Sequence, residues 1–170
     1  MNAGGPRLPK GAAGMRIRMP ILDRLLDDDP GTAIDPPVSP TAALEALHAA
    51  VRRDLEALLS ARRRRWPLPP ALAELVVSPL GYGIPDAASG SYAIAETRAE
   101  LALEVERVIK RFEPRLQSVQ VEIVDTDADL ERTLRLRVAG VLRTDPVVEP
   151  VSFETVIEAV SHEVHVAERN

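Results

Sequence analysis

Residues 105–123 read VERVIKRFEPRLQSVQVEI, and the spacing of the apolar side chains changes within this stretch. Before Pro114 the apolar residues recur every three or four positions, which predicts a helix over about residues 91–112. After Pro114 they alternate with polar residues over 119–123, which predicts a half-buried strand. Proline marks the boundary, because the residue before a proline avoids the helical conformation. The chain therefore passes from helix to sheet at this point.

An earlier helix is predicted over about residues 40–63. Ser39 can cap it through its hydroxyl group, and Pro40 suits the first helical position. Arg62 to Arg65 are expected in its last turn, where positive charge complements the helix dipole. Spacings of three and four residues give this helix one apolar stripe. The stripe consists of Leu44, Leu47, Val51, Leu55, Leu58 and Leu59.

Alternating apolar residues continue toward the end of the chain. They predict strands over 134–142 and about 147–157, and a possible further strand at Val164 and Val166. Residues 71–77 are predicted as a short helix, and the Gly- and Pro-rich residues 78–86 as a structured loop. Helices that precede neighbouring strands are typical of an α+β fold. We expect two main helices packed on one face of a small, mainly antiparallel sheet.

Residues 1–39 are predicted to form a flexible N-terminal tail, and residues 40–170 a single domain. The first forty residues hold seven of the fifteen prolines and five of the nine glycines, which excludes a long periodic element. Apolar residues cluster near 17–26 within this tail, and we expect a short docking segment there.

Composition excludes several classes of function. The chain has no cysteine, so disulfides, Cys-based zinc sites and thiol nucleophiles are excluded, and a reducing compartment is expected. Only 3% of residues are aromatic and the net charge is −5, which argues against nucleic-acid binding. No apolar run reaches the roughly 20 residues of a membrane helix. The first 19 residues lack the apolar centre of a signal peptide, so a cytoplasmic protein is expected.

No metal or cofactor site is predicted. Residues 125–129 begin like a calcium loop, but Leu130 and Leu136 replace the required glycine and glutamate, so a polar turn is expected. His162 and His165 lack an obvious third ligand, and their side chains would point to opposite faces of a strand. His48 is expected on the flank of the first long helix.

No catalytic site is predicted either. Glu104 and Glu106 are two positions apart on a helix and face different directions, so they do not form the carboxylate pair of a glycosidase. The arginines at 62–65 are interpreted as a solvated helix end rather than a nucleic-acid site. Residues 81–83 lack the lysine and the Ser or Thr of a phosphate-binding loop and are interpreted as a tight turn.

Glu113, Pro114 and Arg115 lie at the junction of helix and strand, where proline stiffens the chain between two opposite charges. Two interpretations remain open. The charges can form a local pair that ties helix to sheet. They can equally form a docking site for a partner protein, because arginine is a favoured interface anchor.

Several segments together resemble the TssE family of type VI secretion systems, relatives of the phage baseplate wedge protein once labelled an acidic lysozyme. The Glu113, Pro114 and Arg115 motif, within residues 112–116, is similar to the family's hallmark, and Gly81 stands where a family loop usually carries asparagine. The resemblance covers about residues 40–166, with a short piece near 17–26. The other similar segments are 22–26, 51–62, 78–86 and 150–155.

The resemblance implies a non-enzymatic structural subunit of the baseplate wedge, bound to TssF and TssG. Glu113, Pro114 and Arg115 would dock onto the helical core bundle of these partners. The C-terminal strands would initiate the contractile sheath by exchanging strands with sheath proteins, because an open sheet edge can accept a strand. The subunit would work in the cytoplasm as part of a membrane-docked baseplate. It would need no cofactor, insert into no membrane and bind no nucleic acid.

Two alternatives remain. The chain can be the equivalent subunit of a phage tail or an extracellular injection particle. It can also be a peptidoglycan hydrolase, in keeping with the lysozyme label of some relatives.

Overall fold

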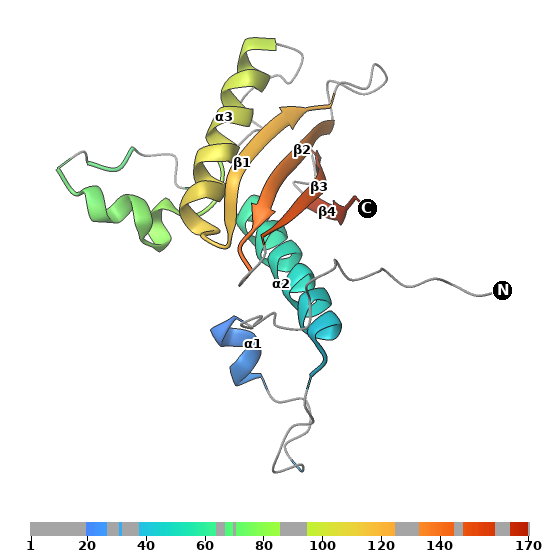
Figure 1. Cartoon of the computed structure of the whole chain (residues 1–170). Coiled ribbons are helices and arrows are strands. Elements are labelled where there is room, and N and C mark those ends of the chain that lie inside the picture. The colour runs from blue at the N-terminus through green and yellow to red at the C-terminus, as the bar shows by residue number, and fades with distance from the viewer. Residues whose placement is uncertain are drawn as a thin grey trace.

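The computed structural model of the chain describes residues 20–26, 31, 38–63, 67–69, 71–85, 95–124, 133–144, 148–158 and 164–169. The α+β class predicted from the sequence is confirmed (Figure 1). The helical elements are α1 (Ile21–Leu25), α2 (Pro40–Ser60), the 3-10 helices η2 (Ala73–Val77) and η3 (Pro79–Gly81), and α3 (Ala95–Phe112). The strands are β1 (Leu116–Ile123), β2 (Thr133–Leu142), β3 (Glu149–Glu158) and β4 (Val164–Glu168).

The four strands form one sheet in the order β1-β2-β3-β4. Every neighbouring pair is antiparallel, so each strand pairs with the next one along the chain. The long helices α2 and α3 lie on one face of this sheet, as Figure 1 shows. The order leaves β1 and β4 as the two edges of the sheet among the described residues.

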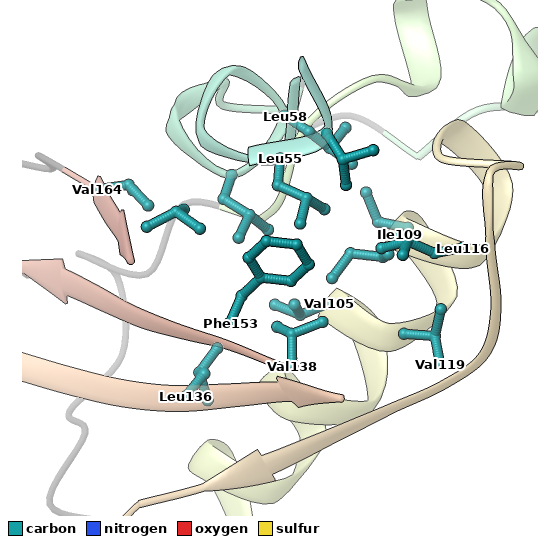
Figure 2. Close-up of a cluster of buried hydrophobic side chains, with 14 of the residues drawn as sticks. Leu55, Leu58, Val105, Ile109, Leu116, Val119, Leu136, Val138, Phe153 and Val164 are labelled. Atoms are coloured by element: carbon teal, nitrogen blue, oxygen red, sulfur yellow. The ribbon is translucent and has the colours of Figure 1, made fainter. Parts of the chain in front are cut away.

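The hydrophobic core lies between the two long helices and the sheet. Figure 2 shows Phe153 of β3 at its centre, between Leu55 and Leu58 of α2 on one side and α3 on the other. All six residues of the predicted α2 stripe are buried. The alternation predicted for the strands is also confirmed, because the side chains on the helix-facing side are buried. These are Leu134, Leu136 and Val138 of β2, Val151, Phe153, Thr155 and Ile157 of β3, and Val164 and Val166 of β4.

Helix α2 begins as predicted but ends earlier. The Ser39 hydroxyl accepts a hydrogen bond from the Ala42 backbone N–H at 3.2 Å, which caps the first turn. The helix stops at Ser60, so the prediction that Arg62 lies in its last turn is wrong. Arg62 instead forms a parallel β-bridge with Ile84. A long-range backbone contact has therefore replaced the last helical turn; Arg64 and Arg65 lie outside the described residues.

The loop that meets the end of α2 depends on two glycines. A Cβ atom at Gly81 would lie 2.1 Å from the backbone oxygen of Val76, and one at Gly83 would lie 2.4 Å from that of Ala61. Gly83 also has φ +94°, which side-chain-bearing residues rarely adopt. No asparagine therefore fits at position 81 without a backbone shift. The helix predicted for 71–77 is present as the 3-10 helix η2.

Strand β1 contains a bulge. Gln117 pairs with Val141, but Gln120 pairs with Ala139, so β1 has one more residue than β2 between these pairs. Ser118 takes φ 50°, the left-handed conformation that absorbs the extra residue. As a result Leu116 and Val119, three positions apart, are both buried.

Other predictions fall on residues outside the described part of the chain. They concern most of the tail over 1–39, the start of the second long helix at 91–94, the turn at 125–129 and His162. Within the described residues, no helix combines the length and apolar character needed to cross a membrane.

Candidate partner-binding site

The turn between α3 and β1 carries the predicted site residues. The backbone N–H of Glu113 donates to the Ile109 carbonyl at 2.8 Å and so completes the last turn of α3. The Glu113 carbonyl in turn accepts from the Leu116 N–H at 3.1 Å, which closes a tight turn around Pro114 and Arg115. Pro114 is exposed, Arg115 is partly exposed and Glu113 is buried.

Glu113 is a buried carboxylate that Arg115 neutralises. The Glu113 side chain is only 3% exposed. The Arg115 Nε donates to Oε1 of Glu113 at 2.5 Å, and its Nη2 pairs with Oε2 of the same carboxylate. The Arg115 backbone N–H also donates to Oε1 at 3.2 Å. This fork arrangement satisfies the charge of Glu113, because burial of a carboxylate is costly unless it is paired and hydrogen-bonded.

A second carboxylate, from α2, holds the same guanidinium. Nη2 of Arg115 donates to Oδ2 of Asp54 at 2.6 Å. Burial of Arg115 disfavours its charge, but the hydrogen bonds and attraction from Glu113 and Asp54 outweigh this and hold the pKa of Arg115 above its usual value. Nη1 of Arg115 is buried and has no hydrogen-bond partner within the described structure. The arginine is thus fixed between two elements with one donor group still unused.

Further ion pairs connect Asp54 to helix α1. Nε of Arg53 donates to Oδ1 of Asp54 at 3.0 Å. Its two terminal nitrogens donate to the Asp23 carboxylate of α1 at 2.5 and 3.3 Å. The hydrogen bond from Arg53 lowers the pKa of Asp23 below its ordinary value of 3.8. We call the five groups Asp23, Arg53, Asp54, Arg115 and Glu113 the charge chain.

The loop after η3 lies beside the charge chain. The Tyr82 ring packs edge-on against Phe112, with 5.3 Å between centroids. Burial raises the pKa of the Tyr82 hydroxyl, and the negative charges of Asp54 and Glu113 raise it further. The loop, helix α2 and the α3–β1 turn therefore meet in one place, and the two glycines that flank Tyr82 give the loop the close approach it needs.

The three predicted site residues are consecutive in the sequence. The structure adds charged residues from α2 and α1 that lie far from them in the chain. Asp54, Arg53 and Asp23 were not singled out from the sequence as site residues. Each lies in a segment that contributed to the family resemblance: Asp23 within 22–26, and the other two within 51–62. The sequence around Asp54 gives no indication that its side chain contacts a turn 61 positions further along the chain.

Of the histidines considered as metal ligands, the structure describes His48 and His165, which lie beside different carboxylates. His48 of α2 lies between two carboxylates, with its Nδ1 2.6 Å from Glu168 and its Nε2 3.4 Å from Glu149. His165 lies on β4, with its side chain largely exposed and 3.9 Å from Glu56. Within the described ranges, no group of three His, Cys, Asp or Glu side chains could hold a metal ion.

Comparison with protein families gives one match that agrees with this fold. The family described as baseplate wedge protein gp25 matches residues 45–147. The match includes most of α2, the loop with Tyr82, the whole of α3 and the turn with Arg115. A search of the curated proteins gives no match. Because the family match spans more than half of its 170 residues, the chain belongs to the baseplate wedge protein gp25 family.

Proposed function

We propose that this chain is the TssE-type wedge subunit of a type VI secretion baseplate, which binds TssF and TssG through Glu113, Pro114 and Arg115. Membership of the wedge family supports a structural role in assembly with other baseplate proteins. The observation that carries the proposal is the fixation of Arg115. Its guanidinium is held by Glu113 and Asp54 from two elements, yet 23% of the side chain stays accessible beside the exposed Pro114.

The three motif residues have different tasks in this proposal. A pre-oriented arginine makes a strong interface anchor, because little side-chain freedom is lost when the partner binds. Arg115 therefore contacts the partner, and Pro114 presents an apolar surface next to it. Glu113 is buried and acts as a positioning residue that holds Arg115 from within.

The test is a titration of the purified TssF–TssG complex with the full chain, wild type beside Arg115→Ala. We expect the variant to bind more weakly by about 2 kcal/mol or more, about thirtyfold in Kd. Arg111→Ala is the matched control, because Arg111 is exposed on the last turn of α3 and makes no ion pair with another described residue. Binding is measured well below the melting transition of each variant, followed by circular dichroism. Equal affinity of folded Arg115→Ala and wild type would contradict the docking role.

The sheath-initiating role rests on the edges of the sheet. At the β1 edge, the outward N–H of Val121 is already occupied by the Glu106 carboxylate at 3.2 Å. At the β4 edge, Arg169 donates to the Ser152 carbonyl of β3, so by antiparallel alternation the backbone groups of Val166 and Glu168 face outward. Strand β4 is therefore the edge that we propose for strand exchange with the sheath.

A proline substitution tests this edge. Glu168→Pro removes an outward N–H of β4, whereas Glu168→Ala removes the side chain and its contact with His48 but keeps the N–H. In a sheath-polymerisation assay seeded by the assembled wedge, we expect Glu168→Pro to reduce seeding and Glu168→Ala to retain it. Equal seeding by both variants would count against the β4 edge.

Two alternative functions each have a test of their own. Binding to the wedge proteins of a contractile phage tail or extracellular particle, and not to TssF–TssG, would assign the chain to that machine.

A peptidoglycan hydrolase needs a carboxyl group with a raised pKa as its general acid. Burial favours this for Glu104, but hydrogen bonds from Arg63 and Arg107 reverse the effect and lower its pKa. Clearing of cell-wall suspensions by the purified chain would support the hydrolase; we expect none.

A further inference from the structure

Helix α1 is attached to the domain by its polar side. Asp23 forms a two-fold hydrogen-bonded ion pair with Arg53 of α2, and none of the helix residues is buried. The apolar residues Ile21, Leu22, Leu25 and Leu26 are 57–75% exposed. We call these four residues the α1 stripe.

This arrangement is the reverse of an ordinary surface helix, which buries its apolar side. Successive residues of a helix are rotated by about 100°, so Ile21, Leu22 and Leu25 share one side and Asp23 lies on the opposite side. Because Asp23 faces α2, the stripe faces away from the domain. Figure 1 shows α1 beside α2 and apart from the sheet.

Nothing within α1 itself explains its formation. It has five residues and no side-chain cap, and a helix this short is unstable alone in water. Its apolar side chains remain mostly exposed. A second surface that covers the stripe would supply that burial.

The charge chain links the α1 stripe to the turn with Arg115. Asp23, Arg53 and Asp54 lead from α1 to Arg115 through consecutive ion pairs of 2.5, 3.0 and 2.6 Å. The positive charge of Arg115 also contributes to the lowered pKa of Asp23, so the two ends are electrostatically close. Helix α1 and the proposed docking turn are thus joined by one run of ion pairs through α2.

The charges at the stripe indicate the chemistry of its partner. Arg24 of α1 is exposed and has no ion-pair partner among the described residues. Asp23, in contrast, is only 14% exposed and already paired. A complementary surface is an amphipathic helix with a leucine-rich face and carboxylates along its border.

We propose that the α1 stripe is the second half of the docking surface, and that it takes an apolar helix with acidic flanks from the same wedge partner that Arg115 binds. The inference rests on the proposed function, and it adds a partner-contacting segment outside the turn. Asp23 and Arg53 are positioning residues, because they orient the stripe without contacting the partner helix themselves.

The experiment titrates the purified TssF–TssG complex with the full chain carrying Leu22→Asp and Leu25→Asp together. Both side chains are exposed, so the melting temperature should not change. We expect affinity to fall at least about tenfold. Leu103→Asp is the matched control, because Leu103 of α3 is 54% exposed and lies outside α1, and its affinity should equal that of the wild type.

A further variant, Arg53→Gln, tests the positioning role. It removes the charge that holds Asp23 but leaves the stripe residues in place, so affinity should fall less than with the double leucine variant. Arg24→Glu should weaken binding more at low salt than at high salt, because charge attraction is screened by salt.

The outcomes separate the two proposals. No binding of the wild type to TssF–TssG overturns the proposed function itself. Loss of binding with Arg115→Ala, together with wild-type affinity of the double leucine variant, overturns only the inference about the stripe. Self-association of the wild type in sedimentation that the leucine variant abolishes would assign the stripe to a second copy of this chain and would also overturn it.

Discussion

Asp54 of α2 accepts a hydrogen bond from the guanidinium of Arg115 at 2.6 Å across 61 positions of the chain. The same guanidinium neutralises the buried Glu113. The two interpretations left open by the sequence, an internal pair and a docking site, are therefore compatible. The internal contacts fix the orientation of Arg115, and 23% of its side chain stays accessible to the proposed partner.

The first prediction concerns the stability of this turn. Arg115→Ala leaves the Glu113 carboxylate buried without its partner, and loss of one member of a buried pair costs about 3 kcal/mol or more of unfolding free energy. Asp54→Ala should cost less, because Asp54 is 37% exposed. Urea unfolding measures both, with Arg111→Ala as the control. An unchanged midpoint for Arg115→Ala would show that water reaches Glu113.

The second prediction concerns Gly83. Alanine there would need a strained backbone at φ +94° and would place its Cβ 2.4 Å from the backbone oxygen of Ala61. We expect Gly83→Ala to lower the unfolding free energy by about 2–3 kcal/mol. Gly140→Ala is the control, because a Cβ at Gly140 has no neighbour closer than 3.4 Å. Similar melting temperatures for the two variants would contradict the close approach of the loop to α2.

The third prediction concerns the bulge in β1. Valine is β-branched and tolerates the left-handed conformation of Ser118 poorly. Ser118→Val should therefore destabilise the domain by about 1–2 kcal/mol, whereas Ser118→Gly should not. Gln120→Val serves as the control, since Gln120 is exposed on the same strand beyond the bulge. Thermal unfolding of the three variants is the measurement. In a regular strand without a bulge, valine at position 118 would be favourable.

The fourth prediction concerns acid pH. A hydrogen bond from Lys110 lowers the pKa of Glu106, and hydrogen bonds from Arg63 and Arg107 lower that of Glu104 despite its burial. A carboxyl group whose pKa is lowered by folding stabilises the fold above its unfolded pKa, here 4.5. That contribution is lost as the pH falls through the lower pKa of the folded state. The unfolding free energy should therefore decrease below about pH 4.5.

A Glu104 variant measures how much of this acid sensitivity comes from Glu104. Glu104→Gln should show a shallower decrease between neutral and acid pH than the wild type, because glutamine does not titrate. Glu96→Gln is the control, since Glu96 is exposed in the first turn of α3 and makes no ion pair with another described residue. Parallel pH profiles for Glu104→Gln and wild type would show that the ion pairs of Glu104 add nothing to stability.

The sequence by itself determined the features that depend on neighbouring residues. Side chains three and four positions apart share a side of a helix, and those two apart share a face of a strand, so the stripe of α2 and the alternation of β2 and β3 could be predicted. Pro114 marked the boundary between α3 and β1 for the same local reason. The family resemblance used these segments in their order along the chain, and the match over residues 45–147 confirms the wider baseplate wedge family.

Only the tertiary structure determined which residues of those segments contact one another. The early end of α2 follows from a bridge to Ile84, 22 positions after Arg62, and the burial of Glu113 follows from the packing around its turn. The meeting of Asp54 with Arg115 and the outward direction of the α1 stripe arise in the same way. Each depends on contacts between residues far apart in the chain, and the spacing of residues within one segment carries no information about such contacts.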